Sequence, residues 1–167
     1  MKFLVHIFFL LSISLVSAQE SFDPLISSGN YKEAYVQIKK RLEEIYSSKV
    51  DDKRIPNDFI SLGSAEERID LNRLFSERKA EPYFVENNPE LFKLHRLAGV
   101  CAFNLREYDS AVRHYYQCFR FKEIEFASDS AVFYELSRVY KEAGYFRAYL
   151  NSLEQACSLD RANADYA

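Results

Sequence analysis

The feature that most constrains the fold is a pair of apolar stripes at helical spacing within residues 88–121. Asn88 suits the N-cap of a helix, because its side chain accepts a backbone hydrogen bond, and Pro89 suits the first helical position. Apolar side chains then recur three and four residues apart over 91–105 and again over 108–119. A short polar break separates the two stripes. The pattern predicts two helices packed against each other as a hairpin.

Gly99 stands in the middle of the first predicted helix. Glycine there costs about 1 kcal/mol relative to alanine, so we expect another helix to approach closely at this point. The three cysteines, Cys101, Cys118 and Cys157, all fall on predicted buried faces. An exported protein permits a disulfide between Cys101 and Cys118, whereas the odd number of cysteines favours free thiols packed in the core.

Two stretches of the chain resemble the tetratricopeptide repeat, a helix–turn–helix unit of about 34 residues. The first stretch carries Ala98-Gly99 in one helix and Tyr108-x2-Ala111-x3-Tyr115 in the next. The second carries Phe133-x2-Leu136-Ser137-x2-Tyr140, which is similar to the family's W-x2-L-G-x2-Y. The chain departs from the family in having no tryptophan, and Glu123 and Arg161 replace the closing proline.

The resemblance implies an all-α fold for residues 19–167, a tetratricopeptide-like helical-hairpin solenoid that winds as an α-α superhelix. Residues 88–124 and 129–162 would be repeats, joined by a lengthened turn at 123–130. Residues 163–167 would begin a further repeat.

The N-terminal part of this domain matches the repeat less completely. Residues 19–47 would form a partial repeat, because Gly29 to Ala34 repeat the turn and helix opening seen later. A polar loop follows, and Ser64 with Glu67 has the pattern of a capping box at a helix start. Residues 48–87 are therefore expected to hold either inserted helices or a degenerate repeat.

Residues 1–18 have the pattern of a signal peptide. Lys2 precedes an apolar stretch over 3–16, and Val16-Ser17-Ala18 resembles a cleavage site. This apolar stretch is shorter than the roughly 20 residues that cross a bilayer as a helix. The sequence therefore predicts export, to a periplasm or cell envelope in a bacterium and by secretion otherwise, with no stable membrane span after cleavage.

Charge and motifs argue against several classes of function. The net charge is −3, whereas nucleic-acid-binding proteins usually have a basic excess. Neither the spacing of His95 and His114 nor any nucleophile or phosphate-loop motif indicates a metal or catalytic site, so both histidines are interpreted as ordinary helix residues. Scattered carboxylates such as Glu66, Glu67 and Asp109 are interpreted as solvated helix faces. We expect no enzyme activity, no cofactor and no metal.

In the tetratricopeptide family, the first helices of successive repeats line a peptide-binding groove, and the resemblance implies one here. The corresponding residues are basic, aromatic or apolar: Lys93, Arg96, Val100, Phe103, Tyr134, Arg138 and Lys141. A basic groove predicts an acidic protein or peptide partner. The alternative is that these side chains are the ordinary lysines and arginines of an exposed helix face.

The predicted last helix ends near Leu159 and presents an apolar flank with Leu150, Leu153 and Ala156. Residues 162–167 are too few to cover this flank with a full helix. The resemblance implies a non-catalytic protein- or peptide-binding scaffold of the cell envelope. The alternative is an assembly subunit that docks, or associates with a second copy of itself, through this C-terminal end.

Overall fold

The computed structural model describes residues 22–47, 88–119, 121 and 126–160, and the described part of the chain is all-helical. Its helices are α2 (Asp23–Ser27), α3 (Tyr31–Ser47), α5 (Pro89–Asn104), α6 (Tyr108–Cys118), α7 (Phe126–Ala143) and α8 (Phe146–Leu159). The expected helix start at residues 88–89 is confirmed, because the Asn88 side chain accepts a hydrogen bond of 3.1 Å from the Leu91 amide.

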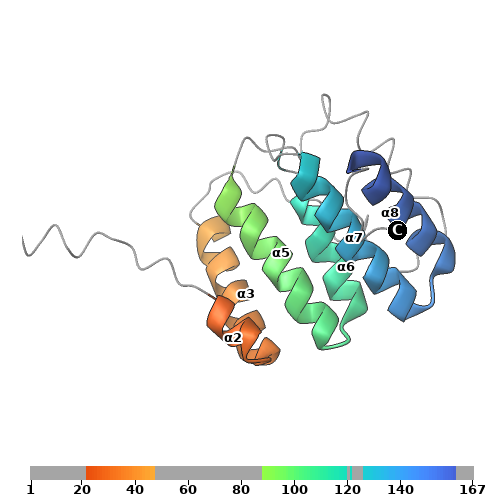
Figure 1. Ribbon diagram of the computed structural model, residues 1–167. Coiled ribbons are helices and arrows are strands. Elements are labelled where there is room, and N and C mark those ends of the chain that lie inside the picture. The colour runs from red at the N-terminus through yellow and green to blue at the C-terminus, as the bar shows by residue number, and fades with distance from the viewer. Residues whose placement is uncertain (1–21, 48–87, 120, 122–125, 161–167) are drawn as a thin grey trace, which may run out of the picture.

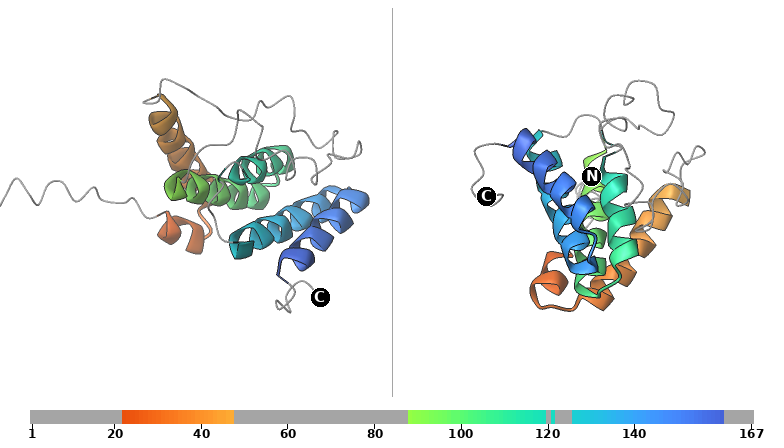
Figure 2. Two further views of the ribbon diagram at one scale, coloured as in Figure 1. Left: turned by 90° about the horizontal axis from the view of Figure 1, so that it is seen from above. Right: turned by 90° about the vertical axis from the view of Figure 1, so that its right-hand side faces the viewer.

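The helices pack in chain order, as three pairs: α2 with α3, α5 with α6, and α7 with α8. Figure 1 shows α5, α7 and α8 following one another across the molecule. Seen from above, α3 and α6 lie on the opposite side of α5 from α7 and α8 (Figure 2, left). Between the pairs, α3 packs on α5 and α6 packs on α7. Helix α5 therefore has neighbours on several sides.

The three pairs share one turn geometry. The first helix of each pair is followed by a residue with positive φ: Gly29 at 77°, Arg106 at 62° and Gly144 at 85°. The amide of this residue donates to the carbonyl three residues earlier, and the next amide donates to the carbonyl five residues earlier, which is the Schellman pattern. The second helix begins two residues after the positive φ in every pair. The same local structure thus recurs along the chain.

The core is built from large aromatic and branched side chains along the seams between helices. The Phe119 ring packs against the Phe133 ring, with their centroids 4.6 Å apart. The other aromatic side chains over 115–121 also belong to the core, because Tyr115, Tyr116 and Phe121 are buried. These rings join α6 to α5 and α7, and they leave α6 with little exposed surface.

The prediction of a close contact at Gly99 is confirmed. A Cβ atom added there would lie 2.7 Å from Cε1 of the Tyr115 ring, closer than carbon atoms approach without something moving. The α6 ring of Tyr115 therefore packs directly on the α5 backbone. Glycine at position 99 permits α5 and α6 to approach, and this contact offsets its low helix propensity.

Three expectations about local structure are wrong in detail. Helix α7 begins at Phe126, so residues 126–130 are helical and the predicted turn over 123–130 is too long. No proline or glycine stands in this stretch to stop a helix. Ala156 is fully buried, not part of an exposed flank, because it lies on the side of α8 that contacts α7. Cys157 is only half-buried, whereas Cys101 and Cys118 are buried.

Other expectations fall on residues outside the described part of the chain. These are the signal peptide over 1–18, the capping box and helices over 48–87, and the start of a further repeat over 163–167.

Candidate functional site

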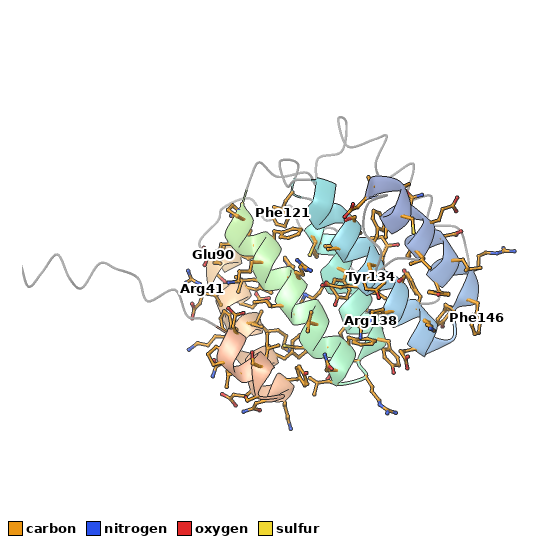
Figure 3. All side chains as sticks on the ribbon, in the orientation of Figure 1. Arg41, Glu90, Phe121, Tyr134, Arg138 and Phe146 are labelled. Atoms are coloured by element: carbon orange, nitrogen blue, oxygen red, sulfur yellow. The ribbon has the colours of Figure 1, made fainter. Side chains whose placement is uncertain are left out.

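The residues predicted to form a groove lie on two helices that contact each other. Lys93, Arg96, Val100 and Phe103 are on α5, while Tyr134, Arg138 and Lys141 are on α7. Three of the seven, Lys93, Arg138 and Lys141, are exposed, and the other four are half-buried. Figure 3 labels Tyr134 and Arg138 on α7, beside α5. We call the surface made by these seven residues the α5–α7 face.

An ion pair within the α5–α7 face joins the two helices. The Arg96 guanidinium donates to both carboxylate oxygens of Glu135, with a shortest N–O distance of 2.6 Å. These bonds raise the pKa of Arg96, and the Glu135 side chain is only 18% exposed. Glu135 was missed by the sequence analysis, which assigned Arg96 to partner binding. The positive charge of Arg96 is therefore already neutralised within the protein.

Arg138 has a different environment. Its guanidinium carbon lies 5.2 Å from the centre of the Phe103 ring, so a cation–π contact also spans α7 and α5. Lys141 lies 5.7 Å from the ring centre of Tyr149 on α8. Arg138 and Lys141 remain exposed, and each stands over an aromatic ring that is only partly buried. These two cations, with Phe103, are the part of the face best placed to meet another molecule.

A second constellation joins α3, α5 and α6 in the interior. The Tyr46 hydroxyl is 2.8 Å from Nε2 of His95, Nδ1 of His95 is 3.2 Å from Nδ1 of His114, and Nε2 of His114 is 3.2 Å from the Tyr35 hydroxyl. The four side chains form one line of hydrogen bonds, which we call the His–Tyr line. It begins and ends on α3.

Tyr35, Tyr46 and His95 of the His–Tyr line are buried, and His114 is half-buried. Burial, together with the nearby Lys39 ammonium, lowers the pKa of His114 to about 4, so this ring is neutral near pH 7. Burial also raises the pKa of Tyr35 above its usual value. The two histidines and Tyr46 line an open pocket of about 370 Å³, whose other lining residues are Lys39, Lys40, Leu42 and Glu43.

The sequence analysis interpreted His95 and His114 as ordinary helix residues and did not anticipate that their rings contact each other and two tyrosines. Each histidine lies within the apolar stripe of its helix, His95 four residues after Leu91 and His114 three residues after Ala111. A polar ring in a buried stripe needs a hydrogen-bond partner. Two such rings on the facing helices of one hairpin were a signal that the sequence contained. The sequence did not indicate that their partners would be tyrosines of α3.

Among the residues that the structure describes, the other cysteines and carboxylates do not gather into a site. None of the three cysteines forms a disulfide, and burial raises the pKa of Cys101 to about 11, which makes it a poor nucleophile. Asp109, one of the scattered carboxylates, forms an ion pair with Arg113 one turn along α6. In the described ranges, no three His, Cys, Asp or Glu side chains are grouped so that they could hold a metal ion.

Comparison with known proteins adds no relative. The chain matches no protein-family model, no curated protein and no solved structure. Of the helices described for this chain, none has the length and apolar character needed to cross a membrane.

Proposed function

We propose that the protein is a non-catalytic scaffold of the tetratricopeptide type that binds an acidic segment of a partner protein on the α5–α7 face. The observation that carries this proposal is the contact between Arg138 and Phe103. A guanidinium held over an aromatic ring at a helix–helix seam offers a fixed positive charge and an apolar surface together. On a peptide, a carboxylate could pair with the guanidinium while a neighbouring apolar side chain packs on the aromatic ring.

The repeated turn supports the repeat assignment within this proposal. Three helical pairs with the same hydrogen-bond pattern after their first helix are what a stack of tetratricopeptide-like hairpins requires. The proposed location is the cell envelope of a bacterium or the exterior of another cell, on the basis of the N-terminal sequence pattern. The binding function does not require any cofactor.

The ion pair between Arg96 and Glu135 changes which residues are assigned to binding. Arg96 is paired with Glu135 across α5 and α7, and Lys93 lies 3.9 Å from the carboxylate of Asp23 on α2. The charges assigned to partner binding are therefore those of Arg138 and Lys141, which are exposed. Exposed charges act mainly on association and its salt dependence, so binding is expected to weaken as salt is raised.

A test uses fluorescent peptides that end in runs of Asp and Glu, with binding followed by anisotropy at low and high salt. Arg138→Glu combined with Lys141→Glu should weaken binding about tenfold or more, because two attractive contacts become repulsive. Lys32→Glu combined with Lys40→Glu makes the same change in net charge on α3 and is the control. Equal loss in both double variants would show that net charge, not the α5–α7 face, attracts the peptide.

Self-association through α8 is a second candidate function, favoured by one observation. Phe146 and Leu150 are 68% and 60% exposed and lie one turn apart on α8. Figure 3 shows Phe146 at the outer edge of the molecule. Exposed apolar side chains that adjoin each other commonly mark an interaction surface. The occupant proposed here is a second copy of the chain.

Sedimentation velocity tests this second function. Phe146→Ser combined with Leu150→Ser should convert a dimer to a monomer at the same concentration. Val36→Ser is the matched control, because Val36 is 56% exposed on α3, far along the chain from α8. A parent protein that is monomeric at high concentration would contradict the self-association proposal and would leave the peptide-binding proposal unaffected.

A further inference from the structure

The His–Tyr line attaches α3 to the rest of the molecule at two points. Tyr35 and Tyr46 are 11 residues apart, about three turns of α3, and both point their hydroxyls at histidines of the α5–α6 hairpin. Ile38 and Leu42, which lie between them on the same side of α3, are buried. The buried face of α3 therefore has a hydrogen bond to a histidine near each of its two ends.

The number of protons in the line decides whether all its hydrogen bonds can form. With both rings neutral, each histidine has one N–H, and the bonds can all run in one direction from Tyr46 to Tyr35 or all in the other. Every ring nitrogen is then either a donor or an acceptor with a partner. With both rings protonated, two N–H groups face each other across the 3.2 Å between the Nδ1 atoms, and the central bond is lost.

The surroundings oppose even the first added proton. A single extra proton keeps the bonds but places a charge in a buried position next to Lys39, and burial with this lysine lowers the pKa of His114. Tyr35 and Tyr46 belong to the line itself. The other charged and titratable groups around it are Lys39, Lys40 and Glu43 from α3, Cys101 from α5, Glu107 at the N-cap of α6, and Arg113 and Cys118 from α6.

We propose that the His95–His114 pair is an acid-operated latch, which holds α3 on α5 and α6 while both rings are neutral and releases α3 when the rings take up protons. Release separates the apolar face of α3 from its partners on α5 and uncovers both surfaces. The inference goes beyond the proposed peptide binding and does not depend on it, because the latch lies between α3 and the α5–α6 hairpin while the proposed peptide site lies on α5 and α7.

The test is hydrogen–deuterium exchange of backbone amides, followed by mass spectrometry at pH 7 and pH 5 and corrected for the intrinsic exchange rates. Protection of the α3 amides should fall roughly 20-fold, the factor that follows from a histidine pKa moving between 6.5 in the open state and about 4 in the closed state. The amides of α7 and α8 should change much less, because no histidine lies within residues 126–160.

Two variants and one control separate the latch from a general effect of acid. His114→Asn removes a titratable ring of the pair, so the 20-fold fall in α3 protection should largely disappear. Lys32→Gln changes an exposed lysine of α3 that does not act on the His114 ring, and it should keep the fall. If His114→Asn does not fold, Lys39→Gln on the exposed surface of α3 should reduce the fall, because the charge opposing protonation is removed.

Protection of α3 that is equal at pH 7 and pH 5 would overturn the latch. The latch would also be overturned if α3 protection in His114→Asn fell between pH 7 and pH 5 as much as in the parent. Where His114→Asn does not fold, the same result in Lys39→Gln would overturn it.

Discussion

The pairs α5–α6 and α7–α8 have the same turn but bury their second helices very differently. Helix α6 contacts both α5 and α7 and buries a broad face: Ala111, Val112, Tyr115, Tyr116, Gln117 and Cys118. Helix α8 buries only a narrow stripe four residues apart: Ala148, Ser152 and Ala156. Each large apolar residue near the start of α8 is exposed or half-buried. Within a repeated hairpin, burial is therefore decided by the neighbouring helices more than by the local pattern.

The two pairs also differ in what they bury. The α5–α6 pair encloses two histidines that contact each other and two tyrosines of α3. The contact of α6 with α7 adds Tyr116 and Tyr140, whose hydroxyls are 3.5 Å apart. Burial raises the pKa of Tyr140 to about 12, so it stays neutral at ordinary pH. The central helices thus depend on polar groups that stay uncharged, whereas α8 presents its larger apolar side chains to solvent.

The largest expected effect comes from changing the same residue type in the two pairs. Phe119→Ala should lower the free energy of unfolding by about 3–5 kcal/mol, because Phe119 is buried against the ring of Phe133 and leaves a cavity. Phe146→Ala should change it by less than about 0.5 kcal/mol, because Phe146 is exposed. Urea unfolding of both variants gives the two values. Similar losses of unfolding free energy in the two variants would mean that Phe146 on α8 is covered in solution.

Overpacking at the α5–α6 contact is expected to have the next largest effect. Gly99→Leu should cost about 1–3 kcal/mol of folding free energy, because even a Cβ atom there meets the Tyr115 ring. Leucine is the better helix former, so propensity alone predicts the opposite sign. Lys93→Leu, at an exposed position on the same helix, is the control. Thermal and urea unfolding of Gly99→Leu at or above parent stability would contradict the close contact.

Acid should affect the α5–α6 pair through His114. The folded pKa, about 4, is below the unfolded value of 6.5, so the unfolded chain binds more protons between these values and stability falls as pH is lowered through this range. The loss between pH 7 and pH 5 should be about 2 kcal/mol. It is measured as the difference between parent and His114→Asn in urea unfolding at each pH. If unfolding free energy changed with pH equally in the two proteins, His114 would not be the cause of this pH dependence.

The sequence predicted the helices well wherever the apolar spacing was regular. The start of α5 at Pro89, the turn before Tyr108 and the opening of α3 at Tyr31 follow from cap residues, glycine and periodicity, which act over a few residues. The start of α7 was misplaced because residues 123–130 lack both an apolar stripe and a breaking residue. Local signals there were too weak to fix a boundary.

The candidate sites were less predictable because they depend on contacts between distant residues. The sequence placed Arg96 and Arg138 on one face, but it gave no sign that Glu135 neutralises one and Phe103 supports the other. The His–Tyr line joins α3 to α5 and α6 across a gap of more than 40 residues. Such pairings follow from how helices pack, which periodicity within one helix does not determine.

The smallest expected effect compares the two turns, where Gly144 and Arg106 have the same role and nearly the same backbone. Positive φ is cheap for glycine and strained for a residue with a Cβ atom, by roughly 1 kcal/mol. Gly144→Ala should therefore lower stability by about 1 kcal/mol, since no neighbouring atom lies within 4 Å to add a steric cost. Arg106→Gly should raise stability by a similar or smaller amount, because the strain is relieved while glycine loses more chain entropy on folding. Both are measured by urea unfolding against the parent. Changes in unfolding free energy of opposite sign and similar size would mean that the two turns are equivalent and that the pairs differ only in their neighbours. A lower unfolding free energy in Arg106→Gly would mean that the Arg106 side chain itself stabilises the α5–α6 turn.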